Sequence, residues 1–110
     1  MFADRKNEEA ISHFKMAIKL KPTHTKAYYN LGIALFADRK NEEAIFHYKE
    51  AIKLNPNYTN AHYNLGIVML QKGDMKEAVY HFRATVRLRP GFIRARDHLE
   101  LALIRSQEIK

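Results

Sequence analysis

The hydrophobic positions of the chain repeat with the period of an α-helix in two neighbouring segments. Between residues 27 and 37, apolar side chains stand three, seven and eight positions after Tyr28, beginning with Leu31. Between residues 44 and 54 the same spacing continues through Tyr48. This spacing places the apolar side chains on one face of a helix. The pattern therefore predicts two amphipathic helices, joined by the polar stretch 38–41.

Polar residues and prolines indicate where these helices begin and end. Asn41 is suited to cap the start of the second helix, and Asp74 and Glu77 have capping-box spacing one period later. Pro56 and Pro90 follow the second helix of each period. Proline cannot continue a helix, so we expect a turn at each of these positions.

A period of 34 residues organises the whole chain. The ten residues Phe2–Ile11 recur unchanged at Phe36–Ile45, and residues 2–35 match residues 36–69 at 24 of 34 positions. Three prolines share one position of the period: Pro22, Pro56 and Pro90. A fixed period of this size predicts a stack of helical units, not a closed globule. The unchanged ten-residue segment indicates a recent duplication or an engineered repeat.

These units resemble tetratricopeptide repeats (TPRs), which are helix–turn–helix units of 34 residues with a first helix A and a second helix B. The unit 25–58 carries the signature residues Tyr28, Leu31, Gly32, Leu35, Ala44, Tyr48, Ala51 and Pro56. The unit 59–92 carries His62, Leu65, Gly66, Met69, Ala78, Phe82, Thr85 and Pro90. His62 and Thr85 depart from the usual bulky aromatic residue and the usual alanine, and we expect both to soften the local packing.

The resemblance implies an all-α, right-handed solenoid of antiparallel helix pairs, with about six helices in one continuous domain. Residues 1–24 fit a partial first repeat that consists of a helix B. Before it, Phe2 and Ala3 fit the last turn of a helix A that is otherwise absent. Complete units follow at 25–58 and 59–92. Residues 93–110 fit a C-terminal capping helix.

Small residues in the units suit a close approach of helix A to helix B. Gly32 and Gly66 lie on helix A, where a larger side chain would push the two helices apart. Glu100 stands at the equivalent position of the last helix. A charged side chain does not suit a tight seam with a following helix, which supports a capping role.

The resemblance also implies a concave groove, lined by the A helices, that binds a peptide segment of a partner protein. The residues that fall at groove positions are Lys26, Tyr29, Asn30, Ile33, Phe36, Asn60, Tyr63, Asn64, Ile67, Leu70, Arg94 and His98. Asn30 and Asn64 recur at one position, and a carboxamide both donates to and accepts from a peptide backbone. For Phe36 and Leu70, packing against neighbouring helices is the alternative.

Some TPR proteins hold the C-terminal carboxylate of heat-shock chaperones with cations and asparagines. Asn64 and Arg94 match those positions, but Tyr29 and Ile33 stand where a lysine and an asparagine are needed, and His98 replaces a second cation. Paired carboxylates require the cations together. We therefore do not expect chaperone tails as the ligand.

Two other functions remain open. The helix of residues 1–24 lacks its partner helix, and its apolar residues are candidates for self-association into a homo-oligomer: Phe2, Ile11, Phe14 and Ile18. Basic pairs on the B helices form a stripe on the expected convex face, suited to an anionic partner: Lys15, Lys19, Lys49, Lys53, Arg83 and Arg87. A solvated face is the simpler interpretation of this stripe.

The net charge of +7 comes from 19 basic and 12 acidic residues, and residues 81–110 hold seven of the basic residues but only three of the acidic ones. This excess favours an acidic partner, nucleic acid or an anionic membrane. Modest basicity is common in proteins that bind none of these, so we do not expect nucleic acid as the main partner.

Catalysis is not expected. The sequence has no cysteine, phosphate-binding glycine loop, metalloprotease histidine pair or nucleophile elbow. His13, His47 and His81 recur once per repeat, too far apart to share one metal, and we expect partly exposed side chains. We predict no cofactor and no metal site. No apolar run is long enough to span a membrane, and we expect a cytoplasmic location.

Overall fold

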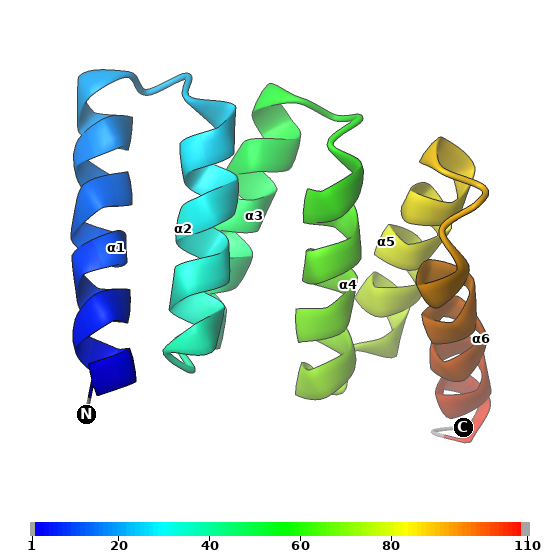
Figure 1. The fold of residues 1–110 in the computed structure, drawn as a ribbon. Coiled ribbons are helices and arrows are strands. Elements are labelled where there is room, and N and C mark those ends of the chain that lie inside the picture. Colours follow the sequence, from blue (N-terminus) through cyan, green and yellow to red (C-terminus); the bar gives the residue numbers. More distant parts are fainter. Residues whose placement is uncertain (1, 109–110) are drawn as a thin grey trace. The chain divides into compact units, whose positions relative to one another are not determined.

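The structure is a computed structural model that describes the backbone of residues 2–108 and the surroundings of the side chains of residues 5–107. Within these residues it contains six α-helices joined by short turns (Figure 1), which confirms the all-α prediction. The helices are α1 (Phe2–Leu20), α2 (Thr25–Ala37), α3 (Asn41–Leu54), α4 (Thr59–Lys72), α5 (Met75–Leu88) and α6 (Ile93–Glu108).

The chain divides into two compact units, which we call unit 1 (Met1–Pro56) and unit 2 (Asn57–Lys110). In unit 1 the helix α2 packs against both α1 and α3. In unit 2 the helix α5 packs against both α4 and α6. Within each unit, consecutive helices run antiparallel (Figure 1), and the middle helix packs against both of its neighbours.

Glycines bring the two helices of each complete repeat close together. A Cβ atom added at Gly32 would lie 2.6 Å from two ring carbons of Tyr48, and one added at Gly66 would lie 2.6 Å from a ring carbon of Phe82. Real Cβ atoms essentially never approach other atoms so closely, and both rings are fully buried. The close-approach role expected for the two glycines is therefore supported at atomic detail.

One predicted helix cap is confirmed and one is wrong. An oxygen of the Asp74 side chain accepts a hydrogen bond from the backbone N–H of Glu77, at 3.2 Å, so Asp74 caps α5. Asn41, however, is already the first residue of α3, and Lys40 precedes it without a side-chain capping bond. The turn between α2 and α3 ends one residue earlier than expected, because the N–H of Lys40 donates to the carbonyl of Leu35 at 2.8 Å.

The repeated ten-residue segment adopts two conformations. In its second copy, α2 ends at Ala37, Arg39 takes a positive φ of 60°, and α3 begins at Asn41. In its first copy the segment is helical throughout, so α1 begins at Phe2 and the expectation that Phe2 and Ala3 end a separate helix is wrong. Carbonyls of α2 close the turn in the second copy.

Candidate functional site

The candidate site in unit 1 is a face of α1 that the described helices leave partly uncovered. Equivalent residues of the repeat are Ala10, Phe14 and Ala17 in α1, and Ala44, Tyr48 and Ala51 in α3. In α3 all three are buried, and Tyr48 keeps only 1 % of its surface exposed because α2 covers this face. In α1 all three are only half-buried. The same pattern of side chains is thus a covered seam in one helix and an accessible surface in the other.

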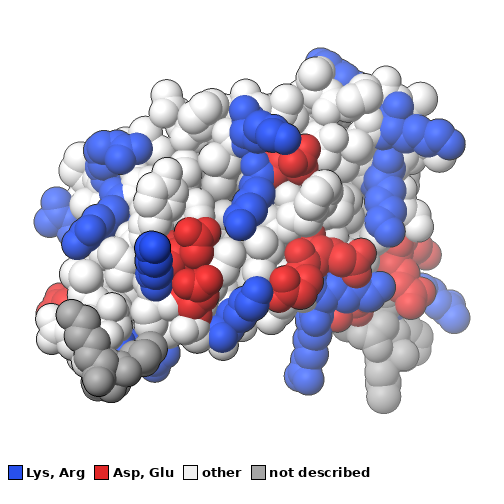
Figure 2. All heavy atoms as spheres, turned by 180° about the vertical axis from the view of Figure 1, so that it is seen from behind, with Lys and Arg blue, Asp and Glu red and all other residues white. Residues whose placement is uncertain are grey.

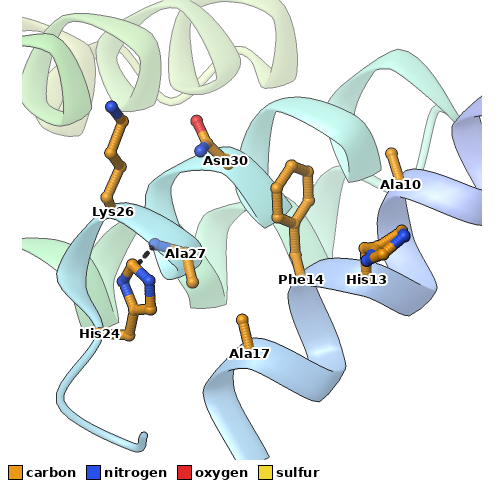
Figure 3. A pocket seen from close by; sticks show the side chains of 8 residues that line it. All are labelled: Ala10, His13, Phe14, Ala17, His24, Lys26, Ala27 and Asn30. Atoms are coloured by element: carbon orange, nitrogen blue, oxygen red, sulfur yellow. Dashed lines mark hydrogen bonds between the residues drawn. The ribbon is translucent and has the colours of Figure 1, made fainter.

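A hollow of about 590 Å³ lies on this face, between α1 and α2. Its lining residues are Ala10, His13, Phe14 and Ala17 from α1, His24 from the turn, and Lys26, Ala27 and Asn30 from α2. Figure 3 shows the Phe14 ring standing up from α1 beside the hollow, with Lys26 and Asn30 rising from α2. The hollow therefore combines apolar side chains with one amide, one ammonium group and two imidazole rings.

Two hydrogen bonds fix the helices around the hollow. The ring nitrogen Nδ1 of His24 accepts from the N–H of Ala27 at 3.3 Å, which caps the start of α2 (Figure 3). The side-chain amide of Asn7 donates to the carbonyl of Ala34 at 2.8 Å and ties α1 to α2. Sequence reasoning missed Asn7, because the residue only appeared as part of the repeated segment.

The structure gathers two of the five predicted groove residues of unit 1 in the hollow. Lys26 is exposed and Asn30 is half-buried, and both line it. Ile33 is exposed on α2 outside the lining, whereas Tyr29 and Phe36 are half-buried. The ring of Tyr29 also packs against Tyr48, with ring centroids 6.1 Å apart, so it contributes to the seam between α2 and α3.

In unit 2, several predicted groove residues make internal contacts. The hydroxyl of Tyr63 lies 3.0 Å from Nδ1 of His98, and that nitrogen lies 2.8 Å from the carbonyl of Arg94. The His98 ring also stacks on Phe82, with centroids 5.5 Å apart. Leu70 is buried, so its burial supports the packing alternative.

The remaining predicted groove residues of unit 2 are accessible to different degrees. Asn60 and Arg94 are exposed on α4 and α6. Asn64 and Ile67 are half-buried on α4. Of the twelve predicted groove residues, the hollow includes only Lys26 and Asn30.

The predicted self-association residues do not form one exposed stripe. Ile11 keeps only 8 % of its surface exposed, so the expectation that it lacks cover is wrong; α1 packs on α2, and its counterpart Ile45 is buried too. Phe14 and Ile18 are half-buried, as an incompletely covered face requires. The side chain of Phe2 lies outside the described residues.

Two histidines form a buried pair that sequence reasoning missed. His81, expected to be partly exposed, keeps 5 % of its surface exposed, and His62 keeps 4 %. Their Nδ1 atoms lie 3.1 Å apart, so one ring donates to the other across the seam of α4 and α5. The equivalent residues of unit 1, Tyr28 and His47, stack with ring centroids 6.1 Å apart. A polar substitution at His62 is thus accommodated by a hydrogen bond.

The six basic residues of the predicted stripe are all exposed, on α1, α3 and α5. Figure 2 shows Lys and Arg side chains standing out from the surface, with groups of acidic side chains between several of them. The ammonium of Lys53 lies 3.6 Å from a carboxylate oxygen of Glu50. The basic surface is therefore partly balanced by acidic residues.

Two features of the described residues bear on other functions. Within the part of the chain that the structure describes, no three His, Cys, Asp or Glu side chains gather as a metal site requires. None of the described helices combines the length and the apolar character needed to cross a membrane.

Comparison with known proteins relates the chain to one family of repeats. A family model described as TPR repeat matches residues 3–38 and 40–73, together more than half of the chain. No curated protein matches the chain in sequence.

Solved structures show the same fold. A crystal structure of MamA is 36% identical, with a TM-score of 0.85 over 87% of this chain and 56% of its own. A second MamA structure is 35% identical, with a TM-score of 0.88 over 92% of this chain and 55% of its own. The chain thus spans little more than half the length of these MamA chains.

A third structure, the first TPR of Spaghetti (RPAP3) bound to the HSP90 peptide SRMEEVD, has a TM-score of 0.87 over 98% of this chain and 83% of its own. Its identity of 24% supports a likeness of fold alone.

Proposed function

Because the chain belongs to the TPR repeat family, whose members are typically non-catalytic scaffolds with a protein-interaction fold, we propose that it binds a peptide segment of a partner protein. The observation that carries this proposal is the hollow beside α1. Its walls are the repeat's own helix-packing residues, accessible here and covered in α3. An accessible face built to pack against a helix or peptide is suited to a binding site.

Affinity in this proposal comes from burying apolar side chains of the partner. The hollow of about 590 Å³ lies within the range of roughly 300–1,000 Å³ that ligand sites occupy. An apolar side chain of the peptide contacts the ring of Phe14 and the methyl groups of Ala10 and Ala17. Burial contributes roughly 25 cal/mol for each Å² of apolar surface removed from water.

Orientation in this proposal comes from α2. The carboxamide of Asn30 presents both a donor and an acceptor, so it holds a peptide group of the partner whatever side chains the partner carries. The ammonium of Lys26 favours an acidic residue of the partner near the same end of α2. The exposed side chain of Ile33 on the same helix adds apolar contact.

Unit 2 is proposed to contribute separately. Asn64 repeats Asn30 by position, and Arg94 repeats Lys26 two periods later, on α6. Both remain predicted contacts for the partner peptide.

The test is a screen of the purified chain against a diverse peptide library, followed by affinity measurements on the selected peptides. Wild type is compared with Asn30→Ala, and the matched control is Asn57→Ala, an asparagine exposed outside the predicted site. We expect Asn30→Ala to weaken binding by about 1 kcal/mol, close to the net value of one hydrogen bond. Asn57→Ala should bind as wild type does.

A second pair of variants separates the units. Phe14→Lys places a charge in the hollow, and Asn64→Ala removes the predicted contact of unit 2. Selected peptides that bind Asn30→Ala and Phe14→Lys as tightly as wild type would refute the hollow as the site. Loss in Asn64→Ala alone would move the site to unit 2.

Self-association is the second candidate function, and one observation favours it. Besides the half-buried Phe14 and Ile18, α1 exposes the apolar side chains of Met16 and Leu20. The helix α6 of a second copy is not the expected occupant of the hollow, because its Glu100 stands where α2 and α4 carry glycine. Sedimentation velocity over a wide concentration range tests this function. A monomer at every concentration would exclude it.

A further inference from the structure

A second cleft lies in unit 2, between α5 and α6, and it shares no lining residue with the hollow of unit 1. Its volume is about 640 Å³. Its lining residues are Lys76, Val79, Tyr80, Arg83 and Arg87 from α5, and Leu103 and Ser106 from α6. The cleft thus combines three basic residues with three large apolar or aromatic ones, and none of its described lining residues is acidic.

The charges of this cleft are not neutralised locally. None of Lys76, Arg83 and Arg87 has an ion pair or a hydrogen-bond partner among the residues that the structure describes. Glu77, the acidic residue of α5, faces the buried pair instead, with its carboxylate 3.7 Å from Nε2 of His81. Arg83 and Arg87 are four residues apart, so they project from the same side of the helix. The cleft therefore offers two neighbouring guanidinium groups to an anionic ligand.

Apolar side chains lie within the same cleft. Tyr80 keeps 62 % of its surface exposed, and Leu103 of α6 is exposed as well. Val79, which also lines the cleft, is half-buried. An exposed aromatic ring beside two arginines has the composition that dominates the energetics of protein interfaces.

Unit 1 provides a natural comparison for this cleft. The counterparts of Lys76, Arg83 and Arg87 in α3 are Glu42, Lys49 and Lys53. The first of these reverses the charge, and Lys53 already contacts Glu50. Lysine also lacks the planar fork with which arginine binds a carboxylate through two hydrogen bonds. The set of one lysine and two arginines therefore belongs to α5 and not to the repeat in general.

We infer that the α5–α6 cleft is a second binding site, and that its ligand is an acidic amphipathic peptide segment of a partner protein. Carboxylates of the segment bind Arg83 and Arg87, and its apolar side chains contact Val79, Tyr80 and Leu103. The charge complementarity of the cleft selects an acidic segment, and its apolar floor requires hydrophobic residues between the acidic ones. This site does not depend on the hollow of unit 1.

A peptide fits the cleft better than a nucleic acid or an anionic membrane. Binding of nucleic acid relies on many phosphate contacts along a basic surface. On the face that Figure 2 draws, acidic side chains lie among the basic ones, so the basic surface is not continuous. The three cations of the cleft line it together with apolar side chains. The apolar lining has no role in a contact made of phosphates alone.

The test measures fluorescence anisotropy with a labelled helical peptide of about 15 residues. Its glutamates, and likewise its leucines, recur every three or four residues, so that each kind shares one face of the helix. Two probe peptides separate the contribution of charge from that of apolar contact. One has glutamine in place of every glutamate, and the other has serine in place of every leucine. Heparin and vesicles of phosphatidylcholine with phosphatidylserine represent the other anionic ligands.

We expect Arg83→Glu/Arg87→Glu to weaken binding of the acidic leucine peptide by about tenfold or more. The matched control Lys49→Glu/Lys53→Glu changes the same number of charges on α3 and should weaken binding less than about threefold. Circular dichroism and urea unfolding check that both variants fold. Both probe peptides should bind more weakly than the parent peptide.

Equal losses in the two double variants would overturn the proposal, because they would reflect net charge and not the cleft. So would a serine peptide that binds as tightly as the leucine peptide. Heparin or vesicles that bind through Arg83 and Arg87 while the acidic peptide does not would also overturn it, in favour of an anionic polymer or a membrane surface. Loss of peptide binding at the hollow would leave this result unchanged.

Discussion

The helices α1 and α3 carry the same pattern of packing residues and use it differently. In α3, Ala44, Tyr48 and Ala51 are buried against α2. In α1, Ala10, Phe14 and Ala17 line a hollow. Small residues on either side of an aromatic ring make a surface that accepts another chain closely, whether that chain belongs to the same repeat or to a partner. The difference shows that burial of this pattern depends on the described helix that packs on it and not on the residues alone.

The largest expected effect comes from truncating the two equivalent rings. Tyr48→Ala should destabilise the protein by about 3–5 kcal/mol, because it empties a fully buried position and leaves a cavity. Phe14→Ala should cost only about 1 kcal/mol, since its ring is half-exposed in the folded protein. Urea unfolding of the two variants and wild type measures the difference. Equal losses would mean that the face of α1 is as covered as that of α3.

The next effect comes from the close approach of α2 to α3. Gly32→Leu should destabilise by roughly 1–3 kcal/mol, because even the Cβ atom would lie 2.6 Å from the ring of the buried Tyr48. Gly91→Ala is the matched control, since no atom lies within 4 Å of a Cβ atom added there. Thermal unfolding followed by circular dichroism compares them. If the two variants melt together, the seam is looser than the structure indicates.

A smaller effect is expected at the bond that ties α1 to α2. Asn7→Ala removes the hydrogen bond to the carbonyl of Ala34 and should cost about 0.5–1.5 kcal/mol. Hydrogen exchange of amides in α1 should accelerate while that of α3 stays unchanged. Unaltered exchange in α1 would show that this bond does not hold the wall of the hollow.

The smallest effect on stability, with a large effect on binding, is expected from filling the hollow. Ala17→Leu should change the free energy of unfolding by about 0.5 kcal/mol or less, because the added side chain enters accessible space. It should nevertheless abolish binding of peptides selected by the wild-type chain. Its counterpart Ala51→Leu enters a fully buried seam and should destabilise by roughly 1–3 kcal/mol. An Ala17→Leu variant that still binds peptide would contradict the proposed site.

Much of the fold follows from sequence periodicity. The 34-residue period, the glycines and the apolar spacing predict the helix pairs, because each of these signals is local or recurs at a fixed distance. The predicted start of the first helix was wrong, because the same ten residues form a turn after α2 and a helix in α1. Identical residues alone cannot determine whether the segment forms a turn or a helix. In the second copy, carbonyls of the preceding helix α2 close the turn.

The candidate site was less predictable. Lys26 and Asn30 were reached through the family resemblance, whereas the hollow depends on which faces are covered. The pairing of His62 with His81 requires the register between two helices, so the sequence favoured an exposed His81. The placement of α6 beside α4 likewise joins Tyr63 to His98 across 35 residues. Contacts of this kind depend on relative helix placement, which composition and spacing do not encode.

The most direct test of the central claim maps a selected peptide onto the chain by nuclear magnetic resonance. Backbone amide shifts are followed as the peptide is titrated into the isotope-labelled protein. The account predicts that the largest changes cluster at Ala10, Phe14, Ala17 and Asn30, and that Ala17→Leu removes them. Changes confined to other surfaces, with the amides around the hollow unmoved at saturation, would contradict the proposal that the open face of α1 binds the partner.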